Sequence, residues 1–271
     1  MNLQIIATQE LQQSHVNMRL YECLCHEIGE QGIVTVVDKN PDIVHLLGAW
    51  NKESIKVIQG FNAKNIPVVF TSVDGLIGLN ASEYKLSNQS SISHCVINIS
   101  QRVAAVHVCG SVEDHIVHEL SKGVNTFCIK NCYYTNVISK QDMLRKFEEM
   151  YVSIAEKHEE SIRRLISTQI KDANISDQAI ARITSKILYL QNLHIKGSIP
   201  IAYVNELSKT FIETDYDERQ LCTVLHKLKL YKFTSRAMQM LSECSTLTEG
   251  FMPMPPTDDK VTTTLKQSVI Q

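Results

Sequence analysis

Two short segments hold residue types that could bind a ligand. Residues 42–50 read DIVHLLGAW, and residues 66–75 read IPVVFTSVDG. Each is an apolar run that stops abruptly at small, polar or aromatic residues, and a helix-like stretch separates the two. In an open parallel sheet, ligands bind in the crevice at the carboxyl ends of the strands. These segments therefore predict a binding site at that edge.

Each candidate side chain has a functional and a structural interpretation. His45 could hydrogen-bond a substrate hydroxyl, but a histidine in an apolar run is more often a core residue with internal partners. Trp50, the only tryptophan, could stack on a sugar ring or cap the sheet edge. Asp74 is the candidate general base, because a carboxylate on a strand-end turn can acquire a useful pKa. An aspartate before Gly75 is also typical of a simple turn.

The first half of the chain predicts the sheet that positions these residues. Residues 1 to about 135 alternate short apolar runs with helical patterns, which indicates an α/β domain with a parallel sheet. Ser54 and Ser111 are predicted to cap two of the intervening helices. We expect strands at Leu3–Ala7, Ile33–Val37, Ile43–Leu46, Val68–Thr71, Cys95–Ile99, Ala104–Val108 and Thr126–Ile129.

The pattern changes to all-helical after Asn131. Ser139 followed by Asp142 resembles a capping box and predicts a long linking helix. The chain is thereby divided into an α/β domain (1–138), a linking helix (139–170), a helical module (171–248) and a tail (249–271). The tail is rich in Pro, Thr, Lys and Asp, so we expect it to be disordered. The module should contain helices at Ile180–Leu193, Ile201–Phe211 and Glu218–Leu230.

Composition narrows the possible functions. The 27 basic and 29 acidic residues give no overall attraction to nucleic acid or anionic membrane. The eight cysteines form no regular framework, so we expect reduced thiols in a cytoplasmic protein. No stretch approaches the roughly 20 apolar residues of a membrane span. The cysteine and histidine spacings do not match a zinc site, and we expect neither a metal nor a cofactor.

The two segments above, with VHVCGSVE at 106–113 and FCIKN at 127–131, resemble the N-terminal domain of GT-B glycosyltransferases of the retaining GT4 type. In that family this domain grips the acceptor. The resemblance implies that a glycan or lipid-linked acceptor is bound, and Asp74 on the strand-end turn remains the candidate catalytic residue. It implies substrate contacts from His45, Gly48, Trp50, Thr71, Ser72, Gly75, Cys109, Glu113 and Asn131.

The chain departs from the family in three respects. Asp74 stands where the family's Thr-Pro-His-Gly motif has a histidine. The family's second Rossmann domain, which binds the nucleotide sugar, has no counterpart in the helical remainder. The loop after the first strand reads TQELQQS at 8–14 and lacks the glycines that let backbone amides approach a phosphate. The sequence therefore predicts an acceptor-side half that acts with a separate donor subunit or binds without turnover. Whether it is an enzyme, as a hexosyltransferase, is left open.

A DNA-binding regulator with a C-terminal winged helix is the alternative hypothesis. Ile201–Phe211 and Glu218–Leu230 resemble a helix-turn-helix, and basic residues follow in the segment. Phosphate contacts would require such a cluster. The turn between the helices is acidic, however, and would repel DNA, so nucleic acid is the less favoured partner. The basic residues are Arg219, Lys227, Lys229, Lys232 and Arg236, and the acidic ones Glu213, Asp215, Asp217 and Glu218.

Overall fold

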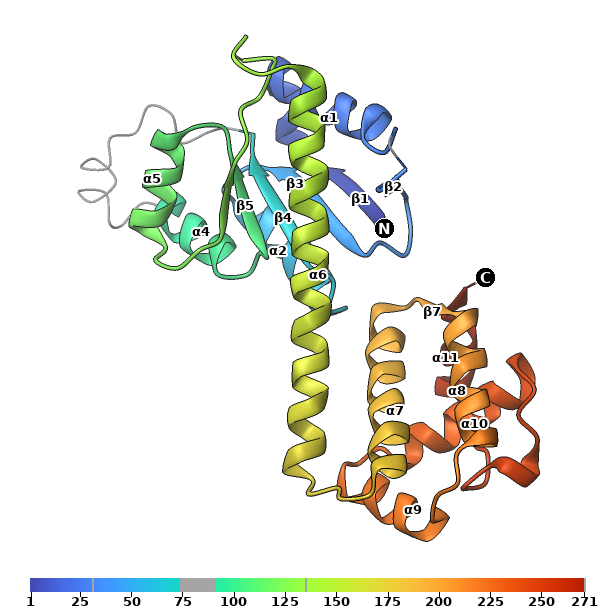
Figure 1. Cartoon of the computed structure of the whole chain (residues 1–271). Helices are drawn as coiled ribbons and strands as arrows, with labels where there is room; N and C mark the ends of the chain where they lie inside the picture. Colours follow the sequence, from blue (N-terminus) through green and yellow to red (C-terminus); the bar gives the residue numbers. More distant parts are fainter. Residues whose placement is uncertain (31, 74–90, 135, 271) are drawn as a thin grey trace. The chain divides into compact units, whose positions relative to one another are not determined.

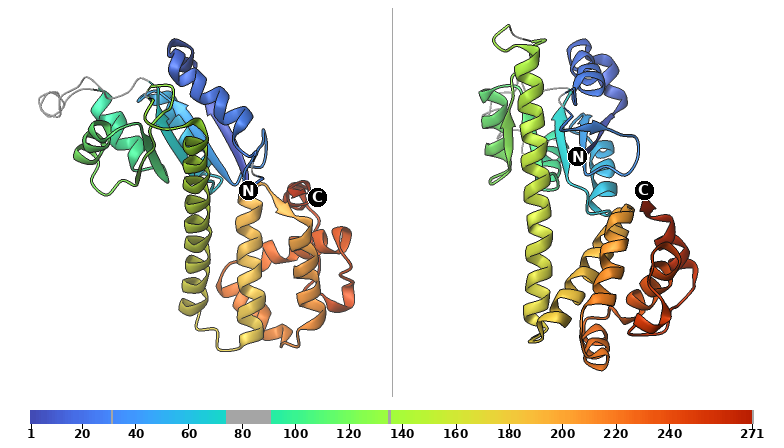
Figure 2. Two further views of the ribbon diagram at one scale, coloured as in Figure 1. Left: turned by 45° about the horizontal axis from the view of Figure 1, so that its top comes forward. Right: turned by 45° about the vertical axis from the view of Figure 1, so that its right-hand side comes forward.

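The computed structural model of the chain describes residues 1–30, 32–73, 91–134 and 136–270 (Figure 1). The chain divides into two compact units, Met1–His158 and Glu159–Gln271. Helix α6 (Lys140–Asp172) crosses this division, and Figure 2 shows that it is continuous. The predicted linking helix thus exists, but it belongs to both units rather than lying between them.

The N-terminal unit is built on a six-stranded sheet in which every neighbouring pair is parallel. The strand order is β2-β1-β3-β4-β5-β6. The predicted α/β class, a Rossmann-like parallel sheet followed by a helical module, is confirmed. The strands are β1 (Asn2–Ala7), β2 (Thr35–Val36), β3 (Ile43–Gly48), β4 (Val68–Ser72), β5 (Ala105–Val108) and β6 (Thr126–Cys128).

Helices cover both faces of this sheet. Helix α1 (His15–Glu27) and the first half of α6 pack on one face, in the cluster that contains Leu47. Helices α2 (Lys52–Asn62), α4 (Ser91–Ser100) and α5 (Ser111–Leu120) pack on the other, around Leu46. Because successive side chains of a strand point to opposite faces, β3 contributes to both clusters and is buried along its whole length.

One predicted strand is wrong. Residues 95–99 lie in α4, and Cys95, Val96 and Ile99 are buried against the sheet. Spacings of one, three and four residues put these side chains on one face of a helix, whereas a short apolar run also fits a buried strand. Two predicted caps shift as well. The N-cap of α2 is Asn51, whose side chain accepts from the Ser54 amide, and the N-cap of α5 is Gly110.

The C-terminal unit is helical. It contains the three predicted helices and two that the sequence did not indicate, α10 and α11. The elements are α7 (Gln178–Lys196), α8 (Ile201–Glu213), α9 (Glu218–Lys227), α10 (Tyr231–Cys244), a 3-10 turn at Glu249–Phe251 and α11 (Lys260–Gln267), with the short parallel strands β7 (Ile199–Pro200) and β8 (Val269–Ile270). No helix among the described residues is long and apolar enough to cross a membrane.

The expectation of a disordered tail is also corrected. Asp259 and Thr262 form a capping box that starts α11, and Arg236 of α10 forms an ion pair with Asp259. Leu265 is fully buried in the module's core. The Ile199 amide donates to the Ser268 carbonyl at 2.7 Å, which pairs β8 with β7. A capping box, the ion pair with Arg236 and the buried side chains of Met254 and Leu265 hold this segment. A count of its polar residues shows none of these contacts and therefore predicts disorder.

Gly48 at the end of β3 is required by packing. A Cβ there would lie 2.6 Å from Ser54 Oγ and 3.0 Å from Thr8 Cγ2, whereas a Cβ on Gly60 of α2 would meet nothing within 4 Å. We expect Gly48→Ala to lower the free energy of unfolding by about 1–3 kcal/mol. Gly60→Ala, the matched control, should raise it by about 0.5–1 kcal/mol through helix propensity. Urea denaturation measures both, and equal effects would contradict the packing argument.

Candidate functional site

Two of the predicted site residues lie in a buried hydrogen-bonded chain beneath α6. His45 of β3 contacts Tyr151 Oη through Nδ1 at 2.5 Å and Thr71 Oγ1 through Nε2 at 2.6 Å. Thr71 Oγ1 lies 2.9 Å from His107 Nδ1, and His107 Nε2 lies 2.9 Å from the Ile129 carbonyl. All four side chains are at most 2% exposed. The chain joins three strands and the segment after β6 to one helix.

The donor and acceptor of each hydrogen bond in this network follow from its last acceptor, the Ile129 carbonyl. A carbonyl oxygen can only accept, so His107 Nε2 carries the proton and His107 Nδ1 accepts from the Thr71 hydroxyl. The Thr71 oxygen then accepts from His45 Nε2–H, and His45 Nδ1 accepts from the Tyr151 hydroxyl. Every donor therefore has an acceptor when both histidines are neutral Nε2–H tautomers.

Burial keeps these groups uncharged. It lowers the pKa of His45 well below its usual value, and the neighbouring His107 lowers it further. Burial lowers the pKa of His107 to about 4 and raises the pKa of Tyr151 well above its usual value. Phe147 of α6 packs edge-on against His107, with ring centroids 4.8 Å apart. The network is thus a neutral, dry element of the core at neutral pH.

In place of the substrate contacts predicted for His45 and Thr71, the structure gives both residues internal partners. His45 is the third residue of β3 rather than its last, and no polar atom of its ring is left for a ligand. The core-histidine interpretation therefore applies. His107, Phe147 and Tyr151 were not among the predicted site residues. A signal for His107 existed, since it lies at an alternating position of an apolar run like His45, whereas nothing local marked Tyr151.

The other candidates near β3 and β4 lie at the carboxyl edge of the sheet. Trp50 follows β3, is 4% exposed, and packs on Phe70 with ring centroids 4.7 Å apart. Its Nε1–H is buried and has no hydrogen-bond partner. Ser72, the last residue of β4, is buried. Gly48 ends β3 and serves the packing described above. Trp50 is thus the one of these side chains with an unused hydrogen-bond donor.

The candidates near β5 and β6 differ in their chemistry. Glu113 is buried in the first turn of α5 and accepts a hydrogen bond from the Cys109 amide at 3.1 Å. Burial, followed by the Glu113 charge, raises the pKa of the Cys109 thiol to about 12, so this thiol is not a nucleophile at neutral pH. Asn131 is 2% exposed. Its Oδ1 accepts from the Tyr133 amide at 2.9 Å, but its Nδ2 has no partner.

Asp74 and Gly75, the predicted catalytic residue and its neighbour, lie outside the described residues. Among the residues that the structure does describe, no group of three or more His, Cys, Asp or Glu side chains could hold a metal ion.

Side chains cap two of the helix N-termini at the carboxyl edge. Ser14 caps α1 and Asn51 caps α2. Asn51 also donates to Glu10 Oε1 at 2.7 Å, which places a carboxylate beside the junction of β1 and β3. At α5 the N-cap is Gly110, which has no side-chain cap, and the Glu113 carboxylate of the first turn accepts from the preceding Cys109 amide. Phosphate groups bind at helix N-termini when the backbone amides are free, and at α1 and α2 a side-chain oxygen already accepts from one of those amides.

No protein-family model matches the chain, and neither a curated protein nor a solved structure matches it.

The buried network predicts a specific dependence of stability on pH. The pKa values of His45 and His107 are lower in the folded state than the usual value, so below about pH 6.5 the unfolded state binds more protons. The free energy of unfolding should be highest above pH 7 and fall progressively between pH 6.5 and 4. Urea denaturation in steps of half a pH unit measures this decline.

His107→Gln tests whether the buried histidines cause this decline in stability. It removes one titrating group and leaves the remaining partners poorly paired, so it should lower stability at pH 8 and make the decline between pH 6.5 and 5 shallower. His15→Gln, at an exposed position, should change neither quantity. An unchanged acid decline in His107→Gln would contradict the assignment.

Proposed function

We propose that the N-terminal unit is the acceptor-side half of a GT-B-type glycosyltransferase and binds a neutral, hydroxyl-bearing glycan or lipid-linked acceptor. The nucleotide sugar is brought by a separate donor subunit, or is not used at all. The chain is then half of a split transferase in the first case and a glycan-binding protein without turnover in the second.

The carboxylates at the carboxyl edge are the observation on which this proposal depends. Glu10 lies beside the end of β1 and the cap of α2, and Glu113 lies in the first turn of α5. A phosphate brought to either position would be repelled by a carboxylate, and at α2 the Ser54 amide is already bonded to Asn51. A nucleotide diphosphate is therefore disfavoured at this edge, and an uncharged ligand is favoured.

Two buried donors support a ligand rich in oxygen acceptors. Trp50 Nε1–H and Asn131 Nδ2 follow β3 and β6, and neither has a partner in the protein. A buried polar group without a partner costs about 1–3 kcal/mol. Sugar hydroxyl and ring oxygens could accept from both groups and recover that free energy.

The secondary structure of the C-terminal unit supports the form of the proposal in which a separate subunit brings the nucleotide sugar. A donor domain of the GT-B type needs its own parallel sheet, whereas β7 and β8, the strands described in this unit, have two residues each. The described C-terminal unit is therefore not a nucleotide-sugar domain of that type.

The single tryptophan gives a direct test, because only one indole N–H signal appears in a ¹H–¹⁵N spectrum. A panel of neutral methyl glycosides, titrated into the full-length protein, should include at least one that shifts this signal. UDP-, GDP-, ADP- and CMP-sugars at the same concentrations should leave it in place. A shift of the indole signal with a nucleotide sugar would contradict the proposal, and so would the absence of a shift with every glycoside.

Asn131→Asp tests the second donor. Aspartate keeps an oxygen for the Tyr133 amide but loses the Nδ2 donor. The affinity of the Asn131→Asp variant for the glycoside that shifts the indole signal should fall about tenfold, as expected for the loss of one hydrogen bond of roughly 1.4 kcal/mol. Gln101→Glu, the same amide-to-acid change at an exposed position, should leave the affinity unchanged.

A DNA-binding function is the second candidate, and the basic cluster of the helical unit is partly committed to other contacts. Arg236 forms a bidentate pair with Asp259, and Lys227 Nζ donates to the Ala173 carbonyl at 2.8 Å. The four acidic residues in and beside the α8–α9 turn, Glu213, Asp215, Asp217 and Glu218, are all exposed. We expect no mobility shift of duplex DNA at about 50 mM salt, a low concentration at which phosphate contacts are strong. A salt-sensitive shift would favour the DNA-binding alternative.

A further inference from the structure

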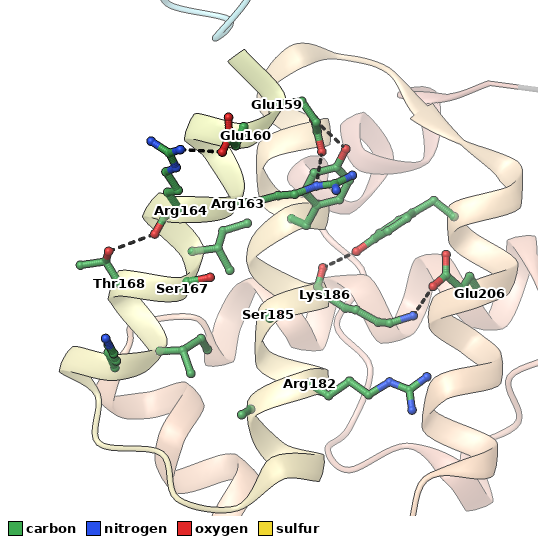
Figure 3. Close-up of a pocket in the computed structure, with 16 residues that line it drawn as sticks. Glu159, Glu160, Arg163, Arg164, Ser167, Thr168, Arg182, Ser185, Lys186 and Glu206 are labelled. Carbon is green, nitrogen blue, oxygen red and sulfur yellow. Dashed lines mark hydrogen bonds and ion pairs between the residues drawn. The ribbon is translucent and has the colours of Figure 1, made fainter. Parts of the chain in front are cut away.

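A groove in the C-terminal unit lies apart from the proposed acceptor site. Helix α7 forms its floor, and α6 from Glu159 onward and α8 contribute its walls (Figure 3). Its volume is about 1280 Å³. All of its lining residues belong to the C-terminal unit, so the groove is a property of that unit alone.

The floor of this groove carries small side chains and is flanked by apolar ones. Ala181 and Ser185 of α7 are four residues apart and therefore lie on one helix face. Ile166 and Ile170 line the groove from α6, and Tyr189 continues the α7 face one turn beyond Ser185. Small residues on one face allow another helix to approach closely, and the flanking isoleucines and tyrosine offer apolar area to bury.

The charges of the groove are unevenly distributed. Its three carboxylates, on Glu159, Glu160 and Glu206, are each paired with a basic neighbour, namely Arg163, Arg164 and Lys186. Lys171 and Arg182 also line the groove, and neither has an ion-pair partner among the described residues. Both lie near the connection between α6 and α7, so that end of the groove has two uncompensated positive charges.

We propose that this groove binds an amphipathic helix of a partner protein, with apolar residues on one face and carboxylates near its C-terminal end. From Glu159 to Lys171 the wall spans about 18 Å, or roughly three helical turns. A helix of that length and about 10 Å diameter occupies roughly 1400 Å³, close to the groove's volume. This inference does not depend on the proposed acceptor function.

The unpaired charges also set the orientation of the bound helix. The C-terminal end of a helix has a partial negative charge, which cations stabilise. The C-terminus of the partner helix should therefore lie at Lys171 and Arg182, so that the helix runs parallel to α6 and antiparallel to α7. A small anion would meet the same charges but leave the apolar floor uncovered. A second copy of the groove would bring like charges onto the surface.

A designed peptide provides the probe. It is a 14-residue, capped helix with leucines three and four residues apart and glutamates elsewhere on its C-terminal half; its partner peptide has lysines in place of the glutamates. Fluorescence anisotropy with the full-length protein should give at least about tenfold tighter binding of the acidic peptide. Equal binding of the two peptides, or binding of neither, would overturn the proposal.

Three variants locate the binding. Arg182→Glu should lower the affinity for the acidic peptide at least about tenfold. Lys209→Glu makes the same charge change on α8 outside the groove and should alter that affinity less than about twofold. Ser185→Trp fills the floor without changing charge and should abolish binding. Circular dichroism confirms folding of each variant. Equal effects of Arg182→Glu and Lys209→Glu, or unaltered binding by Ser185→Trp, would overturn the proposal.

The orientation has its own readout. A nitroxide on the C-terminus of the acidic peptide should broaden the amide signals of Lys171 and Arg182 more than those of Glu159 and Tyr189. A nitroxide on the N-terminus should reverse that order. The opposite pattern would overturn the proposed direction.

Discussion

The hydrogen-bonded chain from Tyr151 to the Ile129 carbonyl is the interaction on which the N-terminal unit depends. It joins α6 to β3, β4 and β5 and ends at the segment that leads into α6 itself. Because a backbone carbonyl terminates the chain, only one arrangement of protons satisfies every member. A fully paired buried network specifies its geometry, whereas a broken one is costly, so the network fixes where α6 lies on the sheet.

This constraint connects the fold with the two proposed sites. The histidine in the first segment holds a helix, so the proposed ligand site is left with the groups at the carboxyl edge, above all Trp50 and Asn131. In that proposal Glu10 and Glu113 at the same edge disfavour a phosphate and favour an uncharged ligand. The helix that the network holds continues past His158 and forms one wall of the groove in the second unit.

The sequence predicted the sheet well because apolar runs bounded by turn residues are a local signal. It failed at Cys95–Ile99, where a run of five residues fits either element, and in the C-terminal segment, where Asp259 acts through Arg236, 23 residues away. A core role for His45 was one of the two interpretations, but its partner Tyr151 could not be predicted because it is 106 residues distant. The segment spacing placed Gly48, Trp50 and Ser72 at the carboxyl edge of the sheet. It could not separate side chains that face that edge from those that lie beneath it.

The most direct measurement is the ¹⁵N chemical shifts of the histidine rings across pH 5–8, with His45 and His107 assigned by substitution. Both residues should show a protonated Nε2 and an unprotonated Nδ1 and should remain neutral throughout the range. A Nδ1–H tautomer at either residue, or titration of either ring near pH 6.5, would contradict the account and return His45 to the set of groups available to a ligand.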